Sequence, residues 1–268
     1  MTTPRFRALR PLLLLVVAAW IVLPLLPLPL WSWSGGWRWP DVLPEQWSGR
    51  AWAYVLSPTA QALPALLTSI VLGVVVTLVA LAAGVPAALA LGRRQFRGRG
   101  AVELLVLAPI LVPPLTVAMG VQVLLIRVGL ADTAPGVVLV HVVFALPYVV
   151  LILAPACAAL GPEWEQQARS LGAGAWRAFW HVTLPMLRPS LAVAALLAFL
   201  GSWSQYALTL LVGGGQVWTL PLLVFSAARS SDPALTAAAA LLFIAPTVVF
   251  LFVAARNLDQ RDGGVGVL

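Results

Sequence analysis

The sequence alternates between long apolar runs and short polar segments. Six apolar runs contain no Asp, Glu, Lys or Arg, and each exceeds the ~18 residues that can cross a bilayer as a helix. They predict an all-α integral membrane protein with six transmembrane helices. The runs are Pro11–Leu30, Ala62–Gly92, Leu104–Ile126, Val137–Leu160, Ser190–Val212 and Pro233–Ala255.

Two features interrupt this pattern. Pro109, Pro113 and Pro114 lie inside the third run, so we expect that helix to be kinked or broken, which membranes tolerate where protein covers the break or a cavity lies beside it. A short helix is expected around Thr219–Arg229, between the fifth and sixth runs.

The longest polar interruption, Gly161–Pro189, separates the fourth and fifth runs. Pro162 can begin a helix there, because the first helical position needs no N–H donor. Gly172 suits its end, because glycine adopts the left-handed conformation at little cost. The segment therefore begins with a short helix that ends near Gly172.

A second short helix is expected from Ala173 to His181, ended by Leu184-Pro185. Trp176, Phe179 and Trp180 fall at positions i, i+3 and i+4 of that helix, which places them on one face. Two short helices at a membrane surface, one of them with three aromatic side chains on one face, suit a contact with another protein.

Composition supports a membrane protein. The 268 residues are 61% hydrophobic and 9% charged, whereas soluble domains carry about 25% charged residues. The net charge of +7 comes with 16 basic residues that are all Arg. No basic stripe with interleaved aromatics is present, so we expect no nucleic-acid partner.

The arginines also set an orientation. With both chain ends in the cytoplasm, twelve of the 16 fall inside and four outside, as the positive-inside rule requires. We therefore predict an N-in, C-in topology, with Gly161–Pro189 in the cytoplasm. The four outside are Arg38, Arg50, Arg127 and Arg229.

We divide the chain into 1–61, an N-terminal span with a Trp-rich outer loop, 62–256, the transmembrane domain, and 257–268, a cytoplasmic tail. A cleaved signal peptide is the alternative for the first run, but the run lacks a clear small-x-small site, so we favour a retained span. The outer loop contains six tryptophans, which are more typical of an interfacial anchor than of a sugar-stacking site. They are Trp31, Trp33, Trp37, Trp39, Trp47 and Trp52.

Few residues offer chemistry. Cys157, the only cysteine, lies in an apolar run and suits a buried, inert thiol. His141 lies mid-span, where we favour a neutral side chain bonded to a neighbouring helix over an ionisable functional group. The two histidines have no metal-ligand spacing, so no metal site is expected.

The cytoplasmic segment resembles the coupling loop of ABC importer permeases, the binding-protein-dependent transport inner-membrane family. That family reads Glu-Ala-Ala, three residues, Gly, nine residues, Ile-x-Leu-Pro. Ala168, Gly172, Val182 and Leu184-Pro185 stand at those spacings, whereas Gln166 and Gln167 replace the Glu and the first Ala. Asp132-Thr133 and Phe144-Ala-Leu-Pro147 also resemble family segments.

The resemblance implies a permease subunit of an ATP-driven importer in the bacterial plasma membrane. The sequence has no P-loop and no lysine to complete one, so ATP would be bound and hydrolysed by a separate subunit, and the chain itself would be no enzyme and hold no cofactor. The implied partners are two ABC ATPase subunits, a second permease chain that is the same or related, an extracytoplasmic solute-binding protein and the lipid bilayer.

The resemblance also assigns roles. With the aromatic face, it places ATPase coupling on Glu165, Ala168, Gly172, Trp176, Phe179, Trp180, Leu184 and Pro185. The alternative for some of the three aromatic residues is packing on this protein's own spans. A polar cluster in the fifth run suits either the translocation path or hydrogen bonds between helices; it comprises Ser202, Trp203, Gln205 and Tyr206.

Thr219-Leu-Pro resembles the branch that transports polyamine, ferric iron, thiamine and molybdate, so the substrate is expected to be thiamine, polyamine, ferric iron or a similar small solute. The alternatives are a secondary transporter, which would show inverted repeats and intramembrane charges, and an intramembrane enzyme, which would need a catalytic partner for His141.

Overall fold

The computed structural model describes residues 13, 16–17, 19–20, 22–36 and 43–262, with only the helical backbone for 250–262. The chain divides into two compact units. The smaller comprises Met1–Leu63 and Leu223–Phe252, and the larger comprises Pro64–Leu222 and Val253–Leu268. The predicted boundaries after residues 61 and 256 stay predictions.

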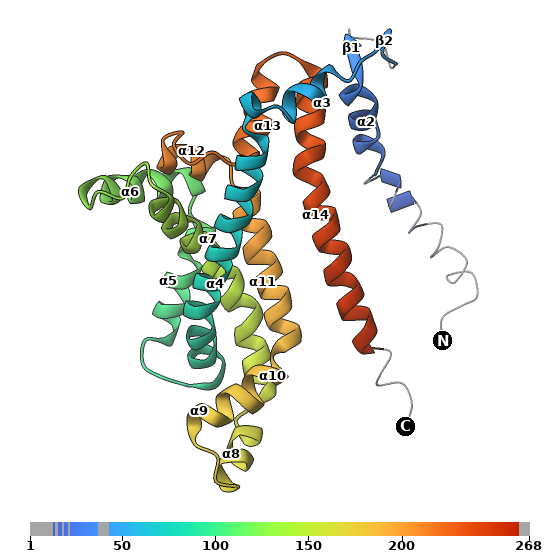
Figure 1. Cartoon of the computed structure of the whole chain (residues 1–268). Coiled ribbons are helices and arrows are strands. Elements are labelled where there is room, and N and C mark those ends of the chain that lie inside the picture. Colours follow the sequence, from blue (N-terminus) through green and yellow to red (C-terminus); the bar gives the residue numbers. More distant parts are fainter. Residues whose placement is uncertain (1–12, 14–15, 18, 21, 37–42, 263–268) are drawn as a thin grey trace. The chain divides into compact units, whose positions relative to one another are not determined.

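The larger unit is built from helices alone among its described residues (Figure 1). Its long helices are α4 (Ala62–Arg93), α5 (Arg99–Leu111), α6 (Pro114–Arg127), α7 (Ala134–Leu160) and α11 (Arg188–Trp203). Its short ones are α8 (Glu163–Ser170), α9 (Ala175–Ala178), the π-helical turn η3 (Phe179–Thr183), α10 (Leu184–Met186) and α12 (Ala207–Gly213).

Helix α7 is the centre of this unit. It packs against α5, α6, α11 and α12, and Val140, Val149 and Leu153 on it are fully buried. Gly84 lets α4 come close, because a Cβ there would collide with the Val149 side chain. Small residues at such crossings are how membrane helices gain packing contacts without a hydrophobic driving force.

The third apolar run is broken, as its prolines predict. Helices α5 and α6 meet at an angle of 106°, with Val112 and Pro113 extended between them. Pro113 and Pro114 allow this, because the residue before a proline is pushed out of the helical conformation.

The fifth run corrects the prediction of one continuous helix over Ser190–Val212. Helix α11 ends at Trp203 and α12 begins at Ala207. Gln122 Nε2 donates to the Leu211 carbonyl (2.9 Å) and the Asp132 N–H to the Val212 carbonyl (2.9 Å), so both hold the far end of α12. At the break itself, the Thr209 hydroxyl donates to the Gln205 carbonyl (2.7 Å). Polar side chains at 204–206 therefore stand at a helix break rather than on a helix face.

Among the described residues, α4 and α7 are long and apolar enough to cross a membrane alone. Up to four spans result if each bent pair, α5 with α6 and α9–α10 with α11, counts as one. Six residues of the first run lie outside the described residues: Pro11, Leu12, Leu14, Leu15, Ala18 and Ile21. The six-span count and the N-in, C-in orientation stay predictions.

The smaller unit folds the Trp-rich segment, which the sequence analysis treated as a loop. It contains η1 (Leu23–Leu25), α2 (Pro27–Ser32), a hairpin of β1 (Ser34–Gly36) and β2 (Gln46–Trp47), α3 (Arg50–Val55), η2 (Pro58–Ala60), most of α13 (Leu220–Arg229) and the start of α14 (Pro233–Asp262). Trp52 Nε1 donates to Ser32 Oγ (3.2 Å), and its ring lies 6.3 Å from that of Trp33. Trp37 and Trp39 lie outside the described residues.

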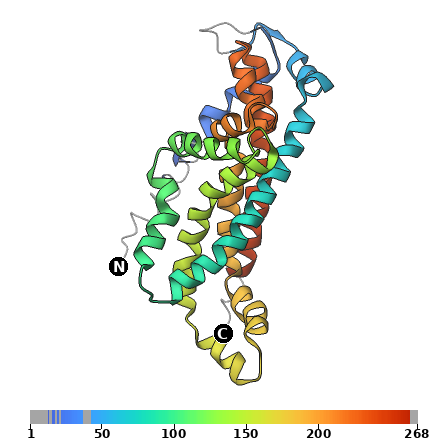
Figure 2. The ribbon, with the colours of Figure 1, turned by 90° about the vertical axis from the view of Figure 1, so that its left-hand side faces the viewer.

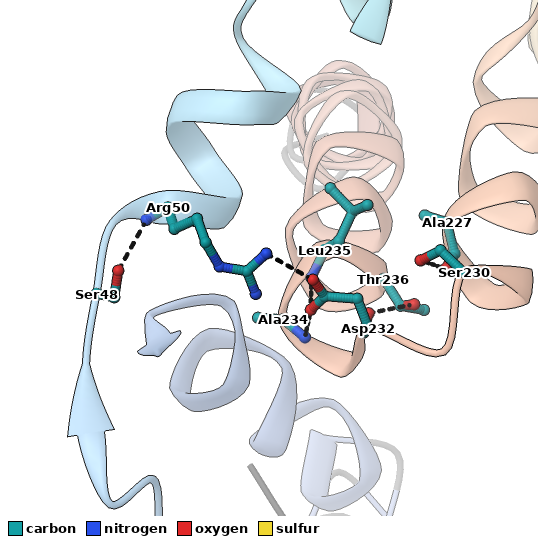
Figure 3. A network of polar contacts seen from close by, with 8 residues as sticks. All are labelled: Ser48, Arg50, Ala227, Ser230, Asp232, Ala234, Leu235 and Thr236. Atoms are coloured by element: carbon teal, nitrogen blue, oxygen red, sulfur yellow. Dashed lines mark hydrogen bonds and ion pairs between the residues drawn. The ribbon is translucent and has the colours of Figure 1, made fainter. Parts of the chain in front are cut away.

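An ion pair joins α3 to the start of α14 (Figure 3). Arg50 Nη1 lies 2.7 Å from Asp232 Oδ2, and Asp232 Oδ1 accepts from the N–H groups of Ala234 and Leu235. Asp232 is thus the N-cap of α14, with Pro233 at the first helical position. The hydrogen bond from Arg50, with help from these two N–H groups, lowers the pKa of Asp232.

We predict that Asp232→Asn and Asp232→Ala separate these two roles. Asn still caps α14 but loses the charge, which should cost under about 1 kcal/mol because the Arg50 side chain is 55% exposed. Ala loses the cap as well, for about 1 kcal/mol more. Thermal unfolding in detergent at neutral pH would rank wild type above Asn and Asn above Ala.

The pH dependence tests the ion pair. Because the folded pKa of Asp232 is lowered, its contribution is present above the ordinary Asp pKa of about 4 and is lost as pH falls through the folded pKa. Wild type and Asp232→Asn should therefore converge in acid. If the difference in Tm between wild type and Asp232→Asn stayed constant with pH, the charge of Asp232 would contribute nothing to stability.

Candidate functional site: a polar segment at one end and a cavity at the other

Residues 161–189, the coupling segment, lie beyond the ends of α7 and α11 (Figure 2, yellow). Both views place α6 at the opposite end of the larger unit. The chain leaves α7 at Gly161, whose φ of 65° requires glycine, and re-enters the bundle at α11. The predicted short helices lie between α7 and α11. Ala178, Thr183 and Leu187 within the segment are buried, and Leu187 belongs to the hydrophobic core. The cytoplasmic location stays a prediction.

Gly172 ends α8 as predicted. Its φ is 91°, its N–H donates to the Arg169 carbonyl, and the next N–H, of Ala173, donates to the Ala168 carbonyl (both 3.0 Å). This is the Schellman arrangement, in which a left-handed residue lets two orphan carbonyls find donors. Gly172 and Ala168 therefore shape the turn through their backbone.

The second short helix differs from the prediction at its end. Helix α9 passes into the π-helical turn η3 and then α10, so helical backbone continues through Pro185 to Met186. The wider π turn just before Pro185 accommodates a residue that lacks an N–H and would clash with an α-helical carbonyl. The bend of 74° comes instead between Met186 and Arg188. Leu184 and Pro185 are half-buried at this turn.

The three predicted aromatic residues form one cluster. The ring centroids of Trp176 and Trp180 are 5.6 Å apart, those of Phe179 and Trp180 5.7 Å, and those of Trp176 and Phe179 6.2 Å. Trp176 is 74% exposed and Trp180 47%. Leu171, at the end of α8, is 90% exposed. Exposed apolar surface of this kind, rimmed by polar residues, is typical of a protein contact.

Glu165 is not exposed with the rest of its helix. Its Oε2 lies 3.0 Å from Arg93 Nη1 and 3.4 Å from Thr183 Oγ1. The same guanidinium donates from Nε to the Cys157 carbonyl at 3.3 Å. Sequence analysis counted Arg93 only as a topology marker, because nothing in the sequence links residues 93 and 165.

A cavity of about 410 Å³ opens between α5, α6, α7 and α11. It lies at both helix breaks, since Pro114 and Gln205 line it. Its polar lining comes from His141, Tyr148, Ser204 and Gln205, and neither a carboxylate nor a guanidinium lines it.

His141 joins three helices. Its Nε2 lies 3.1 Å from Thr209 Oγ1, whose hydroxyl donates to the Gln205 carbonyl (2.7 Å). Thr209 must therefore accept from an Nε2–H. In the neutral ring Nδ1 then accepts from the Ser202 hydroxyl, 2.9 Å away. The predicted hydrogen bonding of His141 to neighbouring helices is observed.

The four proposed path residues separate into two groups. Ser202 and Trp203 are buried: Ser202 is bonded to His141, and the Trp203 ring stacks on Phe199 with centroids 5.7 Å apart. Gln205 lines the cavity, and Tyr206 next to it is half-buried. Sequence analysis missed Tyr148 as a lining residue, and Ser204 belongs to the polar stretch of the fifth run but was not among the path candidates. The available signal was the tyrosine itself, whose hydroxyl stands within the apolar run Val137–Leu160.

The broken helices, the central α7 and the long apolar helices are those of an all-α membrane protein. The family model described as binding-protein-dependent transport system inner membrane component matches residues 80–261. The chain belongs to this family, and is therefore a permease component of a binding-protein-dependent importer in the membrane.

Two curated relatives and one solved structure illustrate the likeness. The molybdenum transport system permease protein ModB of Mycobacterium tuberculosis is 31% identical over 228 residues, covering 80% of this chain and 86% of that protein. The diacetylchitobiose uptake system permease protein NgcG of Streptomyces coelicolor is 32% identical over 182 residues, covering 68% and 60%. A bacterial ABC transporter involved in import of the acidic polysaccharide alginate has the same fold: the TM-score is 0.71 at 18% identity, over 96% of this chain and 98% of that one.

We predict that the bonds of His141 stabilise the bundle as a unit. His141→Leu leaves the buried Ser202 hydroxyl without its acceptor, at a cost of about 1–3 kcal/mol. Thermal unfolding in detergent should show a lower Tm for His141→Leu and a smaller drop for His141→Gln, which keeps a donor and an acceptor.

The matched test is Ser202→Ala. Alone it should lower the Tm, but in the His141→Leu background it should change little, because the shared bond is already lost. Fully additive effects would contradict the proposed bond.

Proposed function

We propose that this chain forms the translocation path of an ATP-driven importer, and that its coupling segment docks on a separate ATPase subunit. The cluster of Trp176, Phe179 and Trp180 carries this proposal; both tryptophans are exposed and Phe179 is half-buried. Exposed apolar side chains on a polar segment mark an interaction site. We favour a covering protein, and insertion of the tryptophans into the membrane interface is the alternative. The chain itself has no lysine to complete a P-loop, so the energy of ATP enters through that partner.

The assembly we propose follows from this arrangement. One permease chain offers one coupling segment, so two ATPase subunits call for a second permease chain, the same or related. An extracytoplasmic solute-binding protein delivers the substrate. Motion of the ATPase pair would alternate the cavity between two packed arrangements.

For the substrate we propose a small oxyanion such as molybdate. ModB, a molybdenum permease, resembles this chain over most of its length. The cavity offers Tyr148, Ser204 and Gln205 as neutral hydrogen-bonding groups. The Thr219-Leu-Pro resemblance suggests thiamine, polyamines and ferric iron beside molybdate. The lining holds neither a carboxylate for these cations nor a guanidinium for an anion, so the choice of an oxyanion rests on the likeness to ModB.

The rival functions find less support. A secondary transporter would place charged groups for ion coupling in the path, and the cavity lining holds none. An intramembrane enzyme would need a nucleophile or acid beside His141, yet both ring nitrogens are bonded to the hydroxyls of Ser202 and Thr209. No carboxylate orients the ring as in a catalytic triad among the described residues.

The first experiment is purification of the tagged chain from native membranes in mild detergent, with mass spectrometry of the proteins that accompany it. We expect an ATPase subunit and a solute-binding protein. Trp176→Ala should reduce ATPase recovery about tenfold or more, as hot-spot aromatics do. Trp47→Ala is the control, because Trp47 is 62% exposed but lies in the smaller unit.

Salt provides a second arm of this experiment. The amount of ATPase recovered with the chain should change little with ionic strength, because salt does not screen the burial of apolar surface. Loss of the ATPase in moderate salt would point to a charged interface. A chain that purifies alone under several detergents would contradict the importer assembly.

Gly172 allows a sharper test of the coupling segment. Gly172→Val places a β-branched side chain at a φ of 91°, which costs about 1–2 kcal/mol and disrupts the turn after α8. We expect loss of ATPase recovery. Gly174→Val is the matched control, since Gly174 has a φ of −65° and open space around its Cβ position.

A further inference from the structure

Arg93 links the coupling segment to two long helices, although it lies far from the segment in sequence. It is the last residue of α4. Its Nη1 lies 3.0 Å from Oε2 of Glu165 on α8, and its Nε donates to the carbonyl of Cys157 on α7 at 3.3 Å. One planar guanidinium therefore holds three helices, which the compact ammonium of lysine would not reproduce.

Glu165 extends this link to the second half of the coupling segment. The same Oε2 that faces Arg93 accepts from the hydroxyl of Thr183 at 3.4 Å. Thr183 is 1% exposed and ends the π-helical turn η3, which follows the aromatic cluster. Both short helical stretches are thus tied to the same carboxylate.

The link is sheltered from water. The side chain of Arg93 is 13% exposed and that of Glu165 26%, whereas neighbouring Arg94 and Arg97 are exposed. Shielding strengthens a charge-assisted hydrogen bond relative to an exposed pair. It also raises the cost of breaking one partner, because the other charge stays partly desolvated.

We propose that Arg93 is a positioning residue that transmits movement of the coupling segment to α4 and α7. This inference rests on the proposed function, in which the segment docks on an ATPase. Without the link, a displaced α8 can swing about Gly161 and the turn at Gly172 while α4 and α7 stay in place. With it, displacement of α8 pulls on the last turn of α4 and on the end of α7 together.

Two parts of the coupling segment would therefore have different roles. The aromatic cluster provides the contact with the partner, and the Arg93–Glu165–Thr183 link provides stiffness toward the bundle. Loss of the cluster should abolish binding of the ATPase. Loss of the link should leave binding in place and abolish the response of the cavity.

The test needs no knowledge of the substrate. Tyr148→Cys in a Cys157→Ala background puts one thiol in this chain at the wall of the cavity, and the bond from Arg93 survives because it uses the backbone carbonyl of residue 157. The complex with its co-purified ATPase is reconstituted in liposomes. The rate at which a polar maleimide labels this chain is then measured without nucleotide and with a non-hydrolysable ATP analogue.

We call the chain with Tyr148→Cys and Cys157→Ala, in which Arg93 is intact, the reporter chain. We expect nucleotide to change its labelling rate. Arg93→Met should reduce the ratio of the two rates at least about fivefold, in the range of ordinary coupling energies, while the ATPase is still recovered and still binds the analogue. Arg94→Met, which removes the same charge from an exposed neighbour, should leave the ratio unchanged. Arg93→Lys should fall between them, because lysine cannot hold α7 and α8 at once.

The charge swap Arg93→Glu with Glu165→Arg adds a readout that a purely structural role would not give. It restores the pair between α4 and α8 but not the bond to the Cys157 carbonyl, so we expect partial recovery of the ratio. A normal ratio in Arg93→Met would overturn the inference. Failure of the reporter chain itself to bind an ATPase would instead overturn the proposed function, so the two failures are distinct.

Discussion

Hydrocarbon offers no hydrogen-bond partners, and the larger unit is arranged around that constraint. Every break in a helix frees backbone groups that protein must cover. The two breaks described, at Val112–Pro113 and at residues 204–206, lie on the same cavity beside α7. Side-chain and loop donors, from Gln122 and Asp132, cover carbonyls of α12. The irregular backbone is therefore concentrated where it can line a space, and α7 stays continuous behind it.

The same constraint decides what could be predicted from the sequence. Proline has no N–H, so the break in the third run was foreseeable from Pro113 and Pro114. The break after Trp203 was not, because residues 203–206 contain neither Pro nor Gly. The π turn before Pro185 was missed for a related reason: a proline predicts disturbance but not whether a helix ends or widens. The hairpin of the smaller unit could not be predicted, because its two short strands show no strong alternation of polar and apolar residues.

The candidate site, too, could be predicted from the sequence only in part. Gly172 was foreseeable because a left-handed helix end is a local requirement, and the aromatic cluster because i, i+3 and i+4 spacing is local. Arg93 was not, since its role depends on a distance of 3.0 Å between residues 72 positions apart. The polar cluster at 202–206 could be located but not oriented, because a helix break changes which side chains face the cavity. Sequence locates polar residues, and packing decides which of them meet.

Helix α11 connects the two ends of the proposed machine. Its first two residues, Arg188 and Pro189, are the last of the coupling segment, and it ends at Trp203, after which Ser204 and Gln205 line the cavity. Its 16 residues rise about 24 Å at ~1.5 Å per residue. It packs along α7, whose Cys157 carbonyl holds Arg93 near one end and whose His141 lines the cavity toward the other. Helices α7 and α11 form a packed pair with the coupling segment at one end and the helix break at the other. A packed bundle resists bending. Movement of the coupling segment in the proposed importer would therefore be concentrated at the break. That is why we place the moving part of the path at residues 204–206 rather than along the smooth face of α7.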